Sequence, residues 1–129
     1  MPHKTYTIGL DIGGSKMAGV LMRRGVIIES STLATPKDNL EHFLIMAKAV
    51  LDPLRQRLEN EKGVLAGIGI GLAGPMDREK GQVLISPNLP MLNKVKIIDE
   101  LRRILELPPE TVITLDNDAK CFVRAEALL

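Results

Sequence analysis

The stretch GLDIGGSKMAGVL, residues 9–21, places an aspartate and a pair of glycines between two apolar runs. Residues 6–10 and 17–22 have the apolar character of strands, so the glycines form a turn between them. Glycine lets the backbone turn tightly and leaves room for another group to approach the main chain. The carboxylate of Asp11 lies beside this turn. The neighbouring residues must therefore indicate which ligand, if any, approaches the turn.

The pattern beyond this hairpin alternates helices and strands. A second turn at residues 23–25 leads into a third strand that runs to residue 33, which completes an antiparallel three-stranded meander. Helices are expected at residues 40–58, at 97–105 and after 118, and strands at 65–72, 83–85 and 111–115. The order predicts an α/β layer fold with a mixed sheet, in which helices and strands alternate after the meander.

Several residues set the expected limits of the first helix. Asp38, followed three residues later by Glu41, resembles a capping box and predicts the start of the helix. Pro53 predicts a kink or a restart, with Asp52 as the cap of the second segment. Gly63 is expected to end the helix.

The composition is typical of a soluble globular domain. Of 129 residues, 45% are hydrophobic and 26% are charged. A net charge of +1 and an aromatic fraction of 2% argue against a nucleic-acid partner, because they leave neither a basic stripe nor a base-stacking surface. No signal-peptide core and no apolar run of roughly 18 residues is present, so we expect a cytoplasmic protein without a membrane partner.

Cys121 is the only cysteine in the sequence. An internal disulfide is therefore impossible, and so is a cysteine-rich zinc site within this chain. We expect the Cys121 side chain to be a small buried apolar group.

Two common phosphate-binding motifs do not fit. A P-loop needs Gly-Lys followed by Ser or Thr at the start of a helix, whereas Gly14 is followed by Ser15 and then Lys16, and strand character comes next. Residues 69–74 match the GxGxxG fingerprint letter for letter. The charged residues 77–80 that follow cannot form the apolar first turns of a packed helix, so we reject this match.

A hairpin turn remains as a candidate phosphate site. Backbone N–H groups around Gly13 and Gly14 can form a nest for an anion, and Ser15 and Lys16 add a hydroxyl and a cation. An aspartate beside phosphates is electrostatically unfavourable unless a metal lies between them. Asp11 therefore predicts Mg²⁺, reached through water. The alternative is a plain β-turn that needs glycine for a positive φ.

A second group of polar residues follows the strand at 111–115. Asn117 can donate to and accept from hydroxyl groups, and Asp118 is suited to act as a base for a substrate hydroxyl. The alternative is that Asp116 or Asp118 caps the following helix.

A third polar stretch lies between two apolar segments. Ser86, Asn88 and two prolines form a rigid loop that suits a polyol ligand, and Gly74 belongs to a turn at the end of a strand. Ordinary loop chemistry explains these residues equally well.

Taken in order, GLDIGGSK, GIGIGLAGP, GQVLISPNLP and DNDAKCFVRAEAL resemble the N-terminal domain of the ROK family (repressors, open reading frames and sugar kinases). The resemblance spans residues 6–129 and includes the glucokinase-like members of the actin-like ATPase superfamily. It implies an RNase H-like domain in which residues 1–129 form one N-terminal lobe, with a C-terminal lobe absent from this chain. The implied reaction is phosphoryl transfer from ATP to a hydroxyl of a hexose or an N-acetylhexosamine.

The resemblance also implies roles for individual residues. The residues implied for the ATP phosphates are Gly13, Gly14, Ser15 and Lys16, with Asp11 holding Mg²⁺ through water. Those implied for the sugar are Gly74, Ser86, Asn88, Asn117 and Asp118. Asp118 is also the implied catalytic base.

The chain departs from the family pattern at a few positions. Ser15 replaces the usual Thr, Lys120 stands where Asn is usual, and Met91 with Leu92 replaces Gly-Trp. The family's second phosphate loop, adenosine site, sugar-binding Glu/His motif and zinc site all fall beyond residue 129. We therefore expect the isolated chain to be inactive, and to self-associate through the face that a missing lobe leaves uncovered.

Two other functions are compatible with the resemblance. One is the sugar-sensing domain of a ROK-type repressor, in which a DNA-binding module precedes the first strand. The first strand here starts within a few residues of Met1, so the kinase is favoured. The other is a non-catalytic module that binds nucleotides or a partner.

Overall fold

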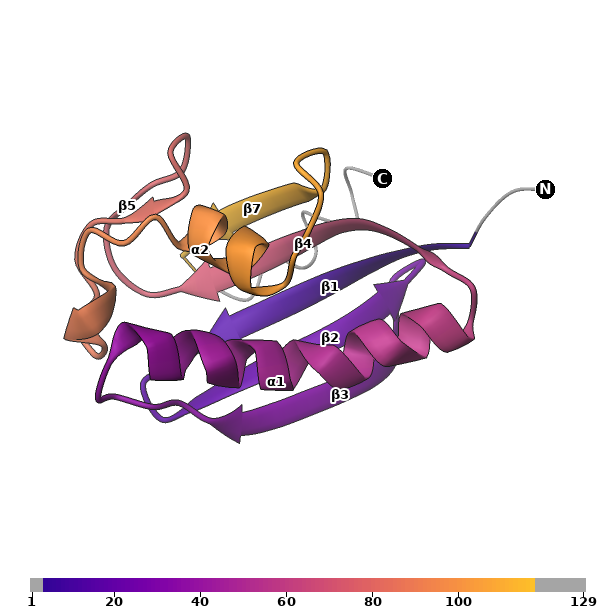
Figure 1. Cartoon of the computed structure of the whole chain (residues 1–129), viewed down its shortest axis with the longest axis horizontal. Helices are drawn as coiled ribbons and strands as arrows, with labels where there is room; N and C mark the ends of the chain where they lie inside the picture. The colour runs from indigo at the N-terminus through magenta and orange to yellow at the C-terminus, as the bar shows by residue number, and fades with distance from the viewer. Residues whose placement is uncertain (1–3, 118–129) are drawn as a thin grey trace.

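The computed structural model describes residues 4–117, in which the helices lie along one twisted sheet (Figure 1). The five-stranded sheet has the order β3-β2-β1-β4-β7. Its strands are β1 (Thr5–Ile12), β2 (Lys16–Arg23), β3 (Val26–Ala34), β4 (Val64–Leu72) and β7 (Val112–Asp116). β2 is antiparallel to β1 and β3, whereas β4 is parallel to β1 and β7. The predicted meander and the mixed sheet are confirmed.

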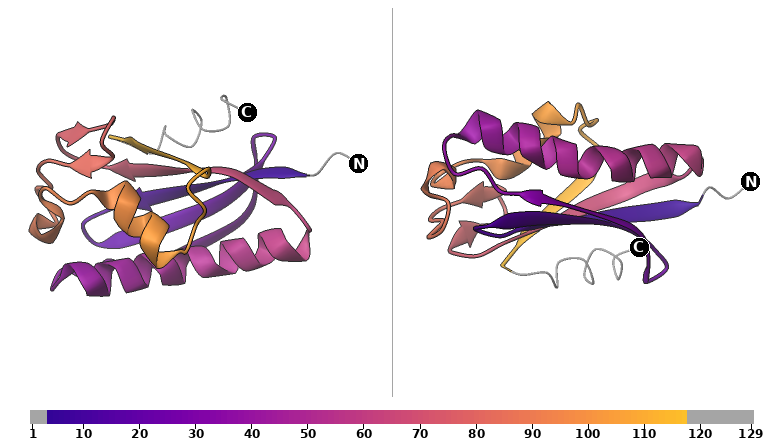
Figure 2. Two further views of the ribbon diagram at one scale, coloured as in Figure 1. Left: turned by 45° about the horizontal axis from the view of Figure 1, so that its top comes forward. Right: turned by 90° about the horizontal axis from the view of Figure 1, so that it is seen from below.

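Both helices, α1 (Leu40–Asn60) and α2 (Ile97–Ile104), lie on the same face of this sheet (Figure 2). The hydrophobic core fills the space between the helices and that face. Alternate residues of the central strands point into it, and α1 supplies the facing side chains. The buried members include Ile8, Leu10, Ile12, Ile68, Ile70, Leu72, Leu44, Leu51 and Leu54. None of the helices within residues 4–117 is long and apolar enough to cross a bilayer.

The start of α1 differs from the prediction by one residue. Asn39 is the N-cap, and its side chain accepts a hydrogen bond of 2.8 Å from the His42 backbone N–H. Asp38 instead contacts the His42 ring at 2.8 Å, because its carboxylate turns toward Nδ1. Glu41 accepts a hydrogen bond from Arg103 of α2 rather than completing a capping box.

The predicted restart at Pro53 is wrong, because α1 continues through this residue to Asn60. Asp52 caps nothing and accepts a hydrogen bond from Lys48 Nζ at 2.8 Å. Proline removes one intrahelical hydrogen bond, and the burial of Leu51 and Leu54 on either side holds the helix against the sheet. The Gly63 N–H closes the end of the helix with a bond of 2.9 Å to the Leu58 carbonyl oxygen.

A small hairpin extends from the end of β4. It consists of β5 (Met76–Asp77) and β6 (Gln82–Val83), and a 3₁₀ turn, η1 (Pro90–Leu92), follows it. The predicted strand 83–85 stops at Val83, because the N–H groups of Leu84 and Ile85 both bond to the Pro75 carbonyl oxygen. β7 lies one residue later than predicted, and the helix expected after residue 118 is outside the described residues.

Candidate functional site

Three strands end together at the edge of the sheet that carries the predicted site residues. Asp11 of β1 pairs in register with Gly71 of β4, and Gly71 pairs with Asp116 of β7. Residues in register on neighbouring strands project to the same face of a sheet. The two aspartates therefore share the face opposite the helices, and no side chain from Gly71 separates them. The carboxyl ends of parallel strands are the usual place for a ligand in such sheets.

In the glycine turn between β1 and β2, the carbonyl oxygens of Gly13, Ser15 and Lys16 accept hydrogen bonds. The Gly13 N–H donates to the Lys16 carbonyl oxygen at 3.0 Å. Thr35, which follows β3, donates from Oγ1 to the Gly13 carbonyl oxygen (2.8 Å) and from its N–H to the Ser15 carbonyl oxygen (3.0 Å). By contrast, the N–H groups of Gly14 and Ser15 have no acceptor within residues 4–117. The turn thus presents two adjacent donors, which is the arrangement of an anion-binding nest.

The glycines of this turn serve close packing. The glycines with positive φ in the described part of the chain are Gly25, Gly74 and Gly81. The positive φ that the plain-turn alternative expected at this turn is therefore absent. A Cβ atom on Gly13 would lie 2.9 Å from the Lys16 carbonyl oxygen, and one on Gly14 would lie 3.0 Å from the Asn88 Cβ. Both distances are too short for an unmoved side chain.

The loop predicted to bind a polyol packs directly against the turn. Gly13 and Gly14 line a cavity of about 60 Å³ together with Ser86 and Asn88. The loop is fixed in place by a bond of 2.7 Å from the Ser86 N–H to the Asn93 side-chain oxygen. The fold therefore brings together two of the segments that the sequence singled out.

A larger hollow, of about 550 Å³, lies between the second half of α1 and the loop before β7. Its lining includes Arg55, Glu59, Leu65 and Leu107. None of the predicted site residues lines it. The candidate site is therefore placed by its hydrogen-bonding groups and not by the size of the hollow.

The third predicted segment joins the site through Asn117. Its Nδ2 donates to the Gly74 carbonyl oxygen at 2.8 Å, and its backbone N–H donates to Asp116 Oδ1 at 2.7 Å. Gly74 has a φ of 109°, and a side chain there would collide with the Ile85 carbonyl oxygen. This glycine is required both for its backbone conformation and for the close approach of the loop.

Two residues at the site escaped the sequence analysis. Thr35 lies at the change of pattern between the third strand and the first helix, where a Thr-Pro pair was the only local signal. Arg78 lies in the charged tip of the β5–β6 hairpin, and its Nη2 donates to Asp116 Oδ1 (2.9 Å) and to Asn117 Oδ1 (2.8 Å). Charged hairpin tips are ordinarily solvated, so this pattern gave no indication of the contact.

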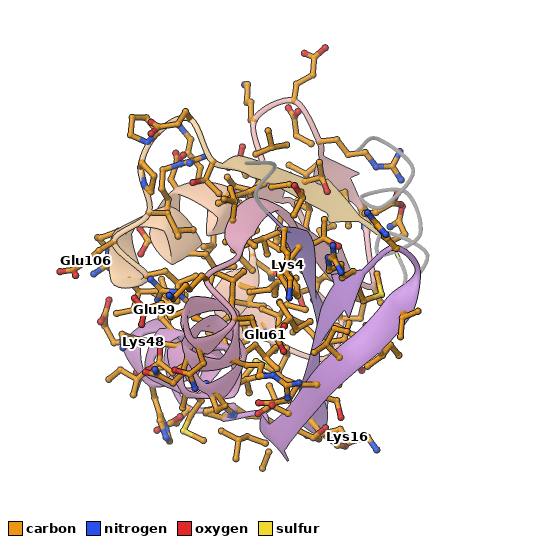
Figure 3. The ribbon with its side chains drawn as sticks, turned by 90° about the vertical axis from the view of Figure 1, so that its right-hand side faces the viewer. Lys4, Lys16, Lys48, Glu59, Glu61 and Glu106 are labelled. Carbon is orange, nitrogen blue, oxygen red and sulfur yellow. The ribbon has the colours of Figure 1, made fainter. Side chains whose placement is uncertain are left out.

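One of the predicted cationic groups, Lys16, does not direct its side chain into this cluster, and the predicted catalytic residue lies outside the described residues. The Lys16 side chain is exposed and points away from the body of the molecule (Figure 3). Asp118 lies outside the described residues, as do Lys120 and Cys121.

The donor set near the turn fits one mode of magnesium binding. Within residues 4–117, no three His, Cys, Asp or Glu side chains gather into a set that could hold a metal ion alone. Mg²⁺ usually keeps several waters and is bound through one or two carboxylates plus substrate phosphates. The half-buried Asp11, beside a turn with free N–H groups, suits that mode.

Known proteins resemble this chain in sequence. The model of the ROK family matches residues 7–129. An N-acetyl-D-glucosamine kinase of Photobacterium profundum is 32% identical over 120 residues, which cover 92% of this chain and 37% of that protein. The chain thus spans little more than a third of the length of this relative.

Solved structures resemble it in fold. A ROK family glucokinase from Streptomyces griseus, in complex with glucose and AMPPNP, matches with a TM-score of 0.70 and 27% identity over 87% of this chain and 33% of the other. A ROK family transcriptional regulator, a homologue of the E. coli MLC protein, matches with a TM-score of 0.75 and 17% identity over 98% and 31%. The predicted α/β fold of the actin-like ATPase type is confirmed.

Proposed function

Because this chain belongs to the ROK family, we propose that it is the N-terminal lobe of a sugar kinase, which transfers the γ-phosphoryl group of ATP to a sugar hydroxyl. The acceptor would be a hexose or an N-acetylhexosamine, in keeping with relatives named as a glucokinase and an N-acetyl-D-glucosamine kinase. The rest of the catalytic machinery would belong to a second lobe.

The observation that carries this proposal is which backbone groups of the glycine turn have hydrogen-bond partners and which do not. Thr35 donates to the carbonyl oxygens of Gly13 and Ser15, whereas the N–H groups of Gly14 and Ser15 are left as donors. These donors would bind phosphate oxygens of ATP, with the Ser15 hydroxyl beside them in the turn. Asp11 would hold Mg²⁺ through water, and the ion would offset the charge of the phosphates.

The sugar would bind across the cavity from the turn. Ser86 and Asn88 form one side of this region, and Asn117 is tied to Gly74 at the neighbouring strand ends. The Asp118 carboxylate would take the proton of the attacking hydroxyl. The sugar oxygen then bonds to the γ-phosphorus, whose bond to the bridging oxygen of ADP breaks.

A role in sugar sensing is the second candidate. The likeness to the transcriptional regulator, at 17% identity, concerns the fold alone. A sensor would bind sugar without transferring phosphate, so turnover separates the two functions.

Asp118→Asn in the full-length kinase tests the proposal. Loss of a general base typically costs about a hundredfold or more in rate, so kcat should fall by that much while sugar affinity is retained. Glu110→Gln, an exposed change in the loop before β7, is the matched control. Near wild-type turnover in Asp118→Asn would remove Asp118 from the base role. The 129-residue chain alone should give no sugar phosphate, because two lobes must close over the reactants.

A further inference from the structure

We propose that Arg78 is a positioning residue for sugar recognition, because it fixes the orientation of the Asn117 side chain. This inference rests on the proposed function, which places a sugar hydroxyl against Asn117. Arg78 does not need to touch the sugar itself.

The contact joins two parts of the chain that are far apart in sequence. Arg78 lies in the tip of the β5–β6 hairpin, and Asn117 follows β7, 39 residues later. A single guanidinium nitrogen, Nη2, donates to Asn117 Oδ1 at 2.8 Å and to Asp116 Oδ1 at 2.9 Å. The hairpin tip is thereby attached to the strand end that leads into the proposed catalytic base.

Asn117 is held at both ends of its amide. Nδ2 donates to the Gly74 carbonyl oxygen, and Oδ1 accepts from Arg78, both at 2.8 Å. A primary amide can otherwise turn over and exchange its donor and acceptor. With these two partners the oxygen faces the guanidinium, so one N–H and one lone pair remain for a hydroxyl in defined directions. Within the described residues, Arg78 is the only donor to Asn117 Oδ1, so it alone fixes the position of the amide oxygen through a hydrogen bond to that atom.

The ion pair with Asp116 does not by itself explain the arrangement. The Arg78 side chain is 54% exposed and that of Asp116 is 12% exposed. Pairs with one solvated partner contribute little to stability. The ion pair also positions Arg78, because the Asp116 carboxylate holds the guanidinium within hydrogen-bonding distance of Asn117 Oδ1. We therefore expect the loss of Arg78 to affect sugar binding more than folding.

The test is the affinity of the full-length protein for glucose and N-acetylglucosamine, measured by calorimetry together with the affinity for AMPPNP. Arg78→Met should weaken sugar binding by about tenfold, the scale of one lost charge-assisted hydrogen bond, and leave AMPPNP binding and Tm nearly unchanged. Arg78→Lys keeps a cationic donor and should recover part of the loss. Lys80→Met removes a cation from the same hairpin tip, where Lys80 is exposed, and serves as the control.

Unchanged sugar affinity in a folded Arg78→Met variant would overturn the inference. Equal weakening of sugar and nucleotide binding with a lowered Tm would also overturn it, because that pattern indicates a structural role. A wild-type protein that binds sugar without turnover would contradict the kinase proposal alone, since the affinities still test Arg78. A wild type that binds neither sugar would overturn both.

Discussion

At the amino end of β1, the Tyr6 hydroxyl donates to Glu61 Oε2 at 2.6 Å, whereas at its carboxyl end the N–H groups of Gly14 and Ser15 have no acceptor within residues 4–117. Figure 3 looks onto the first of these ends, with Glu61 and Lys4 near the centre of the view. The two ends belong to the same strand, but the first is built from side-chain groups and the second presents backbone N–H groups. They differ in whether those groups find partners inside the fold.

The paired end ties the last turn of α1 to three strands. Arg57 donates from Nε to Glu61 (2.8 Å) and from Nη1 to Glu29 of β3 (3.1 Å). The Arg23 guanidinium of β2 lies over the Tyr6 ring, 5.9 Å from its centroid. Every one of these groups has a partner, so the network contributes to stability and offers little to a ligand.

The site end has the opposite character. The carbonyl oxygens of Gly13 and Ser15 accept from Thr35, and the N–H groups of Gly14 and Ser15 are left over. A phosphate can therefore satisfy these two donors without displacing a protein contact. A ligand that binds only the folded state also stabilises it. We therefore propose that one end of the sheet contributes to stability and the other binds a ligand, and three experiments test this division.

The largest effect on nucleotide affinity is expected from a valine in the turn between β1 and β2. In Gly13→Val the added Cβ meets the Lys16 carbonyl oxygen at 2.9 Å, so the turn must open and its donors move. Affinity for AMPPNP with Mg²⁺ should fall by about tenfold or more, the scale of one or two lost phosphate contacts. Calorimetry on the full-length protein measures this, with circular dichroism as the fold check.

The control is Gly25→Val in the turn between β2 and β3. Gly25 has a φ of 75°, and an added Cβ meets no atom within 4 Å. This change should lower Tm through backbone strain and leave nucleotide affinity intact. Equal nucleotide affinities in the two variants would abolish the distinction between the two ends.

A smaller effect is expected from Thr35→Val, which removes the hydroxyl and keeps the branched shape. Without the bond of 2.8 Å, the Gly13 carbonyl oxygen is free to turn toward the phosphate site. The loss of one such bond corresponds to about a threefold to tenfold weaker affinity for AMPPNP. Thr35→Ser should retain wild-type affinity. If the serine variant is as weak as the valine variant, the hydroxyl is not the cause.

The smallest effect concerns pH at the paired end. The hydrogen bonds from Tyr6 and then Arg57 lower the pKa of Glu61 below its ordinary value of 4.5. Because the folded-state pKa is depressed, the stabilisation is present above that ordinary value and is lost as pH falls through the folded-state pKa. Glu61→Gln should therefore lower Tm near neutral pH, and the difference from wild type should shrink on acidification below about pH 4.5.

Glu59→Gln provides the control for this measurement, because Glu59 is exposed on the same turn of α1 and its side chain has no hydrogen-bond partner within residues 4–117. Its Tm should follow that of wild type at every pH. A constant difference between wild type and Glu61→Gln across the acid range would contradict the role of the ionised carboxylate. Neither change should alter AMPPNP affinity.

Local patterns in the sequence were sufficient for the order of the main-sheet strands and the two described helices and for the type of sheet, but they did not predict β5 or η1. Period-two and period-3.6 spacing predicted the meander and both described helices, and short turns predicted which strands are antiparallel. Errors arose where two local signals competed. Asp38 and Asn39 are both good caps, and packing against the sheet outweighed the break expected at Pro53.

The sequence by itself determined the fold class, the family and the position of the glycine turn, because each depends on residues close together in the chain. Only the tertiary structure decided how the turn is used. Thr35 reaches Gly13 across 22 residues and Arg78 reaches Asn117 across 39. Hydrogen bonds over such separations leave no periodic pattern, since they exist only after the strands have paired and brought the groups together. The free donors of Gly14 and Ser15 depend on the same pairing, because a donor is left over only once the other polar groups have found their partners.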